Sequence, residues 1–201
     1  HISIEKSAGI SKYCQFFAVW ASDNVPPFET YDHFKRIYRT FTDELLKYSS
    51  AITLCKDAKD IAKANAEGKI AAMLSIEGGG MILGSLEILR EFYNMGVRMM
   101  TLTWNGRNSI ADGVNVDNAG GLTPFGKMVV GEMERLGMVV DVSHISEKGF
   151  WDVAETTGKP VVASHSNSKT ICGHVRNLTD EQFLEIVKRG GLVGLNFGMS
   201  F

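Results

Sequence analysis

The stretch "LTPFGKMVVGEMERLGMVVDVSHIS", residues 122–146, contains one helix-like segment followed by one strand-like segment. Thr123 before Pro124 is the pattern of a helix N-cap followed by a proline in the first turn. The run "GMVVDVS" at 137–143 is almost continuously apolar, which is typical of a parallel strand buried on both faces. This stretch therefore predicts an α/β fold with a parallel sheet.

The same alternation of strand-like and helix-like segments extends along the whole chain. It predicts six strands, at 13–20, 69–76, 97–104, 138–143, 160–164 and 192–197. Repeated strand-then-helix units favour either an open doubly wound sheet or part of a (β/α)8 barrel. Because no fixed-period repeat or linker-like segment interrupts the pattern, residues 1–201 are predicted to form a single domain.

Several helix boundaries can also be predicted. "TDEQ" at 179–182 has the spacing of a capping box, and Gly190 and Gly191 are expected to end the helix that it starts. A longer helix is expected between the first two strands, where apolar residues recur every three or four positions and should cover one face of the sheet. This stripe contains Phe28, Tyr31, Phe34, Ile37, Tyr38, Phe41 and Leu45.

Composition and charge exclude several kinds of partner. The 201 residues are 44% hydrophobic and 22% charged, as in soluble globular proteins, and the net charge is −2. Without a basic block, there is no electrostatic reason to expect nucleic acid as a partner. No apolar run approaches the roughly 20 residues of a transmembrane helix. The three cysteines are odd in number and far apart, so they do not build a disulfide framework, which favours a reducing compartment, the cytoplasm.

Ligand-capable side chains follow three of the predicted strands. Glu77, His144 and His165 each come directly after an apolar segment. Since the carboxyl ends of parallel strands meet at one face, these residues can surround a common ligand. Each alone has a structural explanation, as a helix cap or a histidine bonded to backbone. Their recurrence favours a shared metal site, and two imidazoles with one carboxylate suit zinc. The other histidines lack such a setting and are expected to be incidental: His1, His33 and His174.

Three further features have two interpretations each. The Asp141 carboxylate could orient the imidazole of His144 through a hydrogen bond, or it could bond to a neighbouring turn. Arg176 could bind a carboxylate through two hydrogen bonds, or it could be a surface residue beside a helix. The glycines of "EGGG", 77–80, could expose backbone N–H groups to a phosphate, or they could let a substrate approach Glu77 closely.

Three segments together resemble the membrane dipeptidase family, also called peptidase family M19. They are "SIEGGGMILGSLEILREFYNMGVRMMTLTWN" (75–105), "LTPFGKMVVGEMERLGMVVDVSHIS" (122–146) and "PVVASHSNSKTICGHVRNLTDEQ" (160–182). The combination of E-G-G, D-x-S-H-x-S and S-H-S with a following R-N is specific. "GISKYCQFFAVW" (9–20) and "GGLVGLNF" (190–197) are also similar to strands of that family.

The resemblance implies a (β/α)8 barrel of the metal-dependent hydrolase kind with two zinc ions. It places Glu77 at the metal-bridging glutamate, which makes Glu77 the expected catalytic residue as well as a ligand. His144 and His165 match the two histidines of the second metal. Arg176 matches an arginine that holds the C-terminal carboxylate of the substrate. The implied activity is hydrolysis of dipeptides by a metal-activated water.

The sequence departs from the family pattern in two ways. The H-x-D motif of the first strand and the later G-x-D-F-D-G block are both absent. We therefore expect the barrel to be incomplete at both ends, without the first strand and the last β/α units. Trp104 stands where many members have a histidine that contacts the substrate, and it is expected to be a substrate-binding residue.

Three functions are consistent with these features. The first is a zinc-dependent dipeptidase, with a dipeptide as substrate and a homodimer as a possible assembly. The alternative is a catalytically impaired barrel that binds small peptides or carboxylates without turnover. A third is a phosphate-binding barrel enzyme that uses the turn at 78–80.

Overall fold

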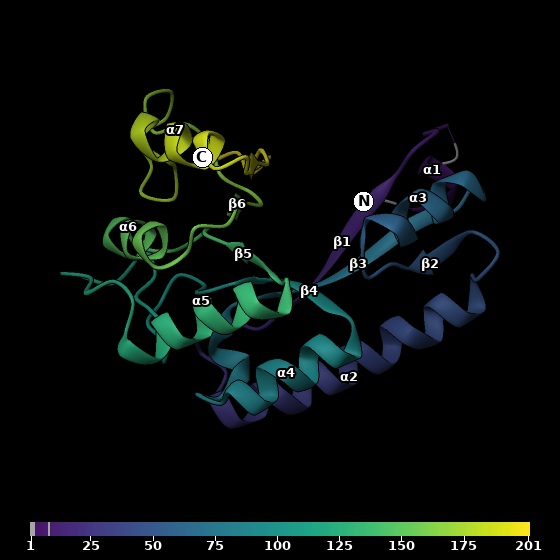
Figure 1. Cartoon of the computed structure of the whole chain (residues 1–201), viewed down its shortest axis with the longest axis horizontal. Helices are drawn as coiled ribbons and strands as arrows, with labels where there is room; N and C mark the ends of the chain where they lie inside the picture. The colour runs from purple at the N-terminus through teal and green to yellow at the C-terminus, as the bar shows by residue number, and fades with distance from the viewer. Residues whose placement is uncertain (1–2, 8) are drawn as a thin grey trace.

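The chain forms one curled sheet of parallel strands with helices along its outer side (Figure 1). The computed structural model describes residues 3–7 and 9–201, so His1 lies outside the described residues. The strands are β1 (Cys14–Trp20), β2 (Ile52–Leu54), β3 (Ile70–Glu77), β4 (Val97–Thr101), β5 (Val139–Asp141), β6 (Val162–Ala163) and β7 (Leu192–Val193). Their order is β1-β3-β4-β5-β6-β7, and β2 pairs with the first part of β3. The predicted parallel sheet is confirmed.

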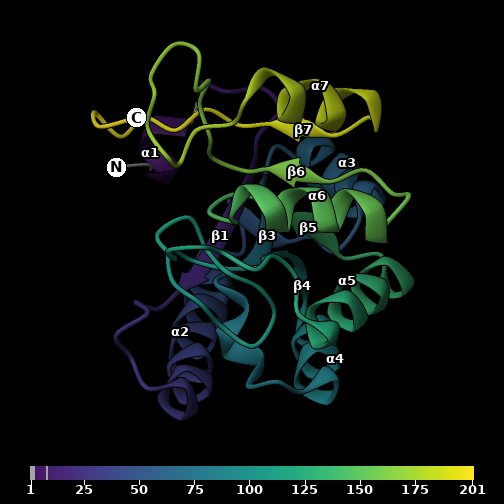
Figure 2. The same ribbon diagram turned by 90° about the vertical axis from the view of Figure 1, so that its left-hand side faces the viewer.

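The helices succeed one another around the curved sheet. They are α1 (Ile4–Ser7), α2 (Pro27–Lys47), α3 (Ala58–Ala66), α4 (Leu86–Met95), α5 (Pro124–Leu136), α6 (Glu147–Thr156) and α7 (Asp180–Lys188), with a 3-10 helix η1 (Gly79–Ile82) after β3. In Figure 2, α2, α4, α5, α6 and α7 lie outside the sheet in chain order. This arrangement is that of part of a (β/α)8 barrel, as predicted.

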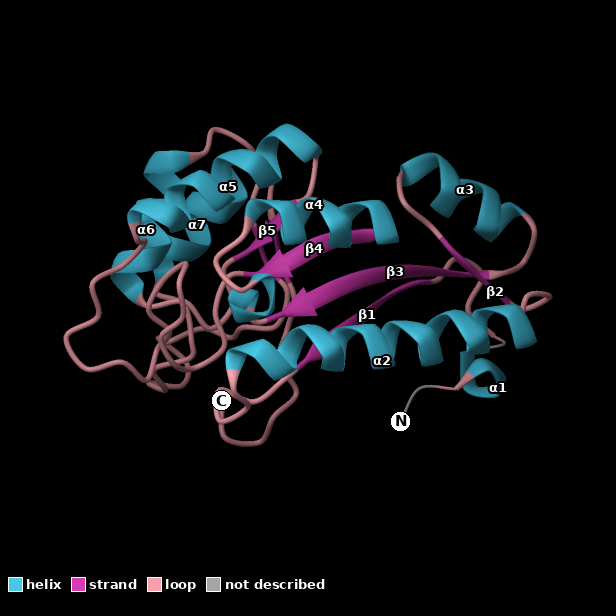
Figure 3. Cartoon of the chain, turned by 90° about the horizontal axis from the view of Figure 1, so that it is seen from below, coloured by secondary structure: helices cyan, strands magenta, loops and turns pink. Residues whose placement is uncertain are grey.

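The strand register brings the ends of four strands into one row. Trp20 is paired with Glu77, Glu77 with Thr101, and Thr101 with Asp141. The six central residues of β3 are buried, as expected for a parallel strand covered on both faces. Figure 3 shows the arrowheads of β1, β3 and β4 pointing towards the end where the long loops gather. Side chains that follow the strands therefore meet at this end.

The predicted helix caps are present. The Thr123 hydroxyl accepts a hydrogen bond from the Gly126 N–H at 2.9 Å. Thr179 and Gln182 form the reciprocal capping box, since each side chain bonds the backbone N–H of the other residue. Gly190 follows α7 with a φ of 73°, which a residue without a Cβ adopts at little cost.

Two sequence predictions about the elements need correction. The later strands are shorter than predicted, because the chain leaves the sheet soon after the last ladder bond; the three-residue β2 was not predicted. The stripe of α2 is narrower than expected, since Phe28 is 71% exposed and Ile37 40% exposed, whereas Phe34 is fully buried. At about 100° per residue, Phe28 lies about 120° around the helix from Phe34. It therefore points away from the sheet.

None of the described helices is a candidate membrane span. Within residues 3–7 and 9–201, none combines the length and the apolar character that crossing a bilayer requires.

The packing of α2 on α4 gives a direct test of the core. Phe34 lies 4.0 Å from Phe92 between ring centroids, and both side chains are fully buried. Phe34→Ala is expected to lower the free energy of unfolding by about 3–5 kcal/mol, because it leaves a cavity. Phe28→Ala, on the same helix but exposed, is expected to change it by about 0.5 kcal/mol or less. Denaturant unfolding of both variants measures the difference; equal effects would contradict the assigned packing.

Candidate metal centre

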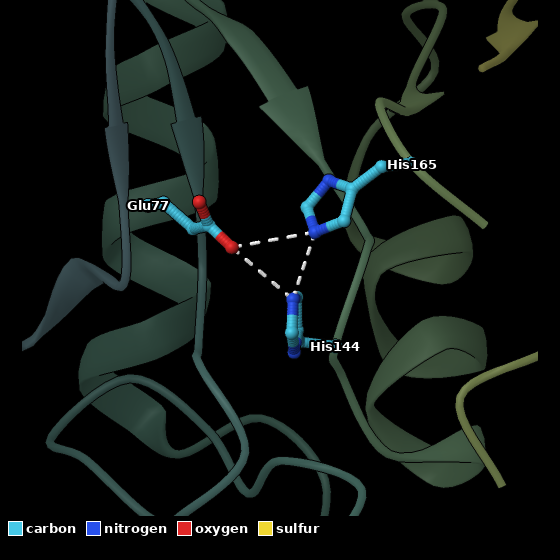
Figure 4. Close-up of side chains that lie close together, drawn as sticks. All are labelled: Glu77, His144 and His165. Atoms are coloured by element: carbon cyan, nitrogen blue, oxygen red, sulfur yellow. Dashed lines mark hydrogen bonds and ion pairs between the residues drawn. The ribbon is translucent and has the colours of Figure 1, made fainter. Parts of the chain in front are cut away.

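Glu77, His144 and His165 point at one common position (Figure 4). Glu77 Oε1 lies 3.2 Å from His144 Nε2 and 3.3 Å from His165 Nε2. The two Nε2 atoms are 2.8 Å apart. Three residues that lie 21 to 88 positions apart in the chain thus bring one ligand atom each to the same place.

Each of the three side chains is placed by the end of a different strand. Glu77 is the last residue of β3, and His165 follows β6. His144 lies in the turn after β5 and has a φ of 69°, a left-handed conformation that costs a residue with a Cβ roughly 1–2 kcal/mol. Such strain is typically retained where it aims a functional side chain. Here it directs the imidazole of His144 towards Glu77.

The outer nitrogens of both imidazoles are held by polar neighbours. His144 Nδ1 lies 2.8 Å from Asn105 Oδ1, and His165 Nδ1 lies 2.7 Å from Ser164 Oγ. When each Nδ1 donates a proton to its oxygen, each Nε2 presents a lone pair to the centre. Two lone pairs and a carboxylate oxygen that face one another need a positive charge between them. The cluster is therefore built for a cation.

The protonation of the cluster agrees with this arrangement. Burial acts to raise the pKa of Glu77, but in the absence of a metal the hydrogen bonds that protonated Nε2 atoms of His144 and His165 donate to its carboxylate outweigh burial and lower the pKa to about 2. Burial lowers the pKa of His144, against the opposing effect of Glu77. At neutral pH Glu77 is therefore ionised and His144 favours its neutral form, the states in which both bind a metal.

The donor set fits a divalent metal ion. The three ligand atoms lie within 4.8 Å of one another. Histidine nitrogen and carboxylate oxygen are the ligands of many zinc sites, and hydrogen bonds to the outer imidazole nitrogens are a regular feature of such sites. The residues present therefore fit the metal that the sequence analysis expects.

Arg176 lies beside this cluster and is 5% exposed. Its two terminal nitrogens donate to Ser166 Oγ at 3.3 Å and to the backbone oxygen of His165 at 3.0 Å. Its Nε has no partner within the described part of the chain, and burial lowers the pKa of Arg176 to about 10. A buried guanidinium without a carboxylate in contact is costly unless an anion joins it.

Trp104 forms one wall next to the cluster. Its ring lies 5.1 Å from that of Trp20, edge to face, and 6.1 Å from the ring of His144. It thus lies next to one of the three ligand residues, His144.

Two of the open interpretations are decided by hydrogen bonds. Asp141 does not contact His144; it accepts from the turn at Ser143 and from Ser164, which in turn contacts His165. The N–H groups of Gly78 and Gly79 donate to the backbone oxygens of Thr101 and Leu102. They are therefore not available to a phosphate.

Close packing explains one of these glycines. A Cβ on Gly79 would collide with the Ile110 side chain and lie 2.9 Å from the Leu102 oxygen. Gly79 thus lets the end of β3 and the loop after β4 approach each other.

Sequence reasoning did not find Asn105 and Ser164. Both directly adjoin residues that it did find, Trp104 and His165. The signal available was their position after a predicted strand or at its end, where polar side chains reach the site. Their partners, however, are set by pairing across strands.

Comparison with known sequences identifies the family. The sequence model of the membrane dipeptidase family (peptidase family M19) matches residues 1–201. The chain belongs to this family. A curated relative, an uncharacterized dipeptidase of Schizosaccharomyces pombe, is 38% identical over 160 residues, covering 77% of this chain and 38% of the relative. The chain spans between 38% and 61% of the length of the curated relatives that it matches.

Solved structures agree with the family assignment. Dipeptidase AC, a metallo peptidase of family M19, superposes with a TM-score of 0.91 at 27% identity, covering 100% of this chain and 64% of that one. A metallo peptidase from Rhodobacter sphaeroides, liganded with a phosphinate mimic of the dipeptide L-Ala-D-Ala, gives 0.89 at 26% identity over 98% of this chain and 64% of that chain. The predicted barrel class and family are confirmed.

The cluster makes a prediction about metal binding. Glu77→Gln keeps the shape of the side chain but removes the only anionic ligand of the three. Since changes in residues behind the ligands already cost roughly 10–100-fold in metal affinity, loss of this ligand should weaken zinc binding at least that much. Titration calorimetry measures it. Glu44→Gln, which changes an exposed residue of α2 that pairs with Lys47, serves as the control. Equal affinities in the two variants would contradict the site.

Proposed function

We propose that this protein is a zinc-dependent dipeptidase that hydrolyses the peptide bond of dipeptides with a metal-activated water. The single observation that carries the proposal is the convergence of Glu77 Oε1 with the Nε2 atoms of His144 and His165. Membership of the membrane dipeptidase family supports the same reaction.

The roles of the residues follow from their contacts. Glu77, His144 and His165 would hold the metal, and the family resemblance implies a second zinc ion that shares Glu77. When bound, zinc polarises the scissile carbonyl and makes water acidic enough to act as a nucleophile near neutral pH. Glu77 stays ionised because its pKa is lowered to about 2. Asn105 and Ser164 hold the outer nitrogens of the two imidazoles.

Arg176 and Trp104 are proposed to bind the substrate. A dipeptide has a free carboxylate, which would complete the partners of the buried Arg176 guanidinium. Trp104 offers an apolar wall against a substrate side chain, next to His144. The dipeptide mimic in the Rhodobacter sphaeroides relative supports a substrate of this size.

Three further expectations belong to the proposal. The cytoplasm is the proposed location, which the odd number of cysteines supports. A homodimer stays a prediction, to be checked by light scattering. The assignment of residues 1–201 to a single domain also stays a prediction.

Metal removal tests the reaction. Chelation of the full-length protein is expected to abolish dipeptide hydrolysis, and added zinc is expected to restore it more fully than other divalent ions. Glu77→Gln and His165→Ala should each prevent the recovery, because each removes a proposed ligand. Hydrolysis that survives both substitutions would refute the mechanism. Calorimetric binding of peptide with neither metal nor hydrolysis would instead favour the alternative of a binding barrel without turnover.

Arg176 allows a test of substrate recognition. The wild type is expected to prefer a dipeptide over its C-terminal amide, because only the former offers a carboxylate. Arg176→Met should lower kcat/KM for the free dipeptide by roughly 10- to 150-fold, which corresponds to about 1.5–3 kcal/mol for a charged hydrogen bond. It should leave kcat/KM for the amide nearly unchanged.

The Met variant is suited to this test, since replacing a buried charge with an apolar side chain of similar volume is often tolerated. An equal decrease in kcat/KM for the dipeptide and for its amide would show that Arg176 does not bind the carboxylate. Thermal unfolding of the variant provides the control for folding.

A further inference from the structure

Asp141 is a fully buried carboxylate at the end of β5 with four hydrogen-bond donors. Its Oδ1 accepts from the backbone N–H groups of Ser143 and Ser164, both at 2.9 Å. Its Oδ2 accepts from the hydroxyls of Thr101 at 2.6 Å and Ser164 at 2.5 Å. No Lys or Arg side chain pairs with it among residues 3–7 and 9–201. The four donors stabilise its charge, and the nearby guanidinium of Arg176, although not in contact, interacts favourably with it.

The direction of the Ser164 proton follows from this arrangement. An ionised carboxylate has no proton to give, so the Ser164 hydroxyl donates to Asp141. A hydroxyl has only one proton, and the Ser164 oxygen can therefore only accept from His165 Nδ1 at 2.7 Å. His165 must then carry its proton on Nδ1. In the neutral ring its Nε2, which faces Glu77 Oε1 at 3.3 Å and His144 Nε2 at 2.8 Å, then presents a lone pair.

The neighbouring Ser143 hydroxyl is consistent with this assignment. It accepts the backbone N–H of His165 at 3.2 Å and lies 3.4 Å from Ser164 Oγ. The Ser143 hydroxyl can thus donate its proton to Ser164 Oγ, because the Ser164 hydroxyl donates its own proton to Asp141. Every donor in the group has an acceptor when His165 is protonated at Nδ1.

We propose that Asp141 is a positioning residue that acts through the Ser164 hydroxyl to hold His165 in the tautomer protonated at Nδ1, so that Nε2 is presented as a metal ligand. The metal part of this proposal rests on the proposed function; the control of the tautomer does not. Asp141 thereby acts on His165, and not on His144, which was one of the two interpretations that the sequence left open.

The second histidine has no such control. His144 Nδ1 faces the side-chain amide of Asn105, and an amide can turn to offer either its oxygen or its nitrogen. Asn105 can therefore accompany either tautomer of His144. The hydrogen bonds from Ser164 to Asp141 and from His165 Nδ1 to Ser164 are compatible with only one neutral tautomer of His165.

A purely structural role is the competing explanation. Through Thr101 and Ser164, Asp141 also ties β4 and β6 to β5. In that case, its loss would reduce stability without changing the tautomer of His165.

Asp141→Asn separates the two explanations because the amide can take only one orientation. Its oxygen must face the backbone N–H groups of Ser143 and Ser164, which can only donate. Its nitrogen then faces Ser164 Oγ and donates to it, so the hydroxyl proton turns towards His165 Nδ1. The variant should invert the tautomer of His165 and place the proton on Nε2, where it blocks a metal.

The experiment uses nitrogen-15 NMR of the histidine rings in the full-length, metal-free protein, followed by calorimetric titration with zinc alone. In the wild type, Nδ1 of His165 should have the shift of a protonated nitrogen, and in Asp141→Asn that of an unprotonated one. Zinc should bind the variant roughly 10–100-fold more weakly.

Thr101→Val is the matched control. It removes another donor to the same Oδ2 without touching Ser164, so it should leave both the tautomer and the zinc affinity unchanged. Ser164→Ala gives a second route if Asp141→Asn does not fold, since it removes the bridging hydroxyl but leaves Asp141 three donors. It should leave Nδ1 of His165 only partly protonated and weaken zinc binding.

The outcomes are distinct. An unchanged Nδ1 signal of His165 in Asp141→Asn or in Ser164→Ala would overturn the proposal, as would equal weakening of zinc binding by Thr101→Val. A switched tautomer in a protein whose wild type binds no zinc would support the control by Asp141 and refute the proposed function instead.

Discussion

The register of the parallel ladder is the constraint on which the rest of this structure depends. Pairing of Glu77 with Thr101, and of Thr101 with Asp141, puts the last residues of β3, β4 and β5 in one row. A shift by one residue would turn every side chain to the opposite face. The ligand atoms meet because the strands end together and because apolar burial of β3 on both faces holds the register.

The cluster of Glu77, His144 and His165 contains one carboxylate and two imidazoles, and its geometry is suited to binding a cation. The orientation of each histidine towards Glu77 is set by its local backbone conformation or by hydrogen bonds. His144 is aimed by a left-handed turn, and His165 is held by hydrogen bonds to its ring and to its backbone N–H. The resulting cluster leaves acceptors facing one another at its centre. Arg176 lies close by, and its guanidinium is buried without a contacting carboxylate. This position therefore favours binding of an anion.

Much of the fold could be predicted because it depends on local patterns. The capping residues Thr123 and Thr179 and the apolar strands lie where sequence rules place them. The failures are also physical. Phe28 and Ile37 satisfy a spacing of three or four residues, but the arc that the sheet covers is narrower than that spacing allows. The three residues of β2 are too short to form a recognisable pattern.

The sequence by itself determined the alternation of the longer strands and helices, the family, and the three residues able to bind a metal, because these depend on the periodicity and chemistry of residues along the chain. Only the tertiary structure decided which groups form hydrogen bonds with the outer nitrogens of the two imidazoles. Asp141 is three positions from His144 in the chain, yet its hydroxyl partner Ser164 serves His165. The reason is that hydrogen bonds between neighbouring strands join residues by register, and separation in the sequence carries no information about that.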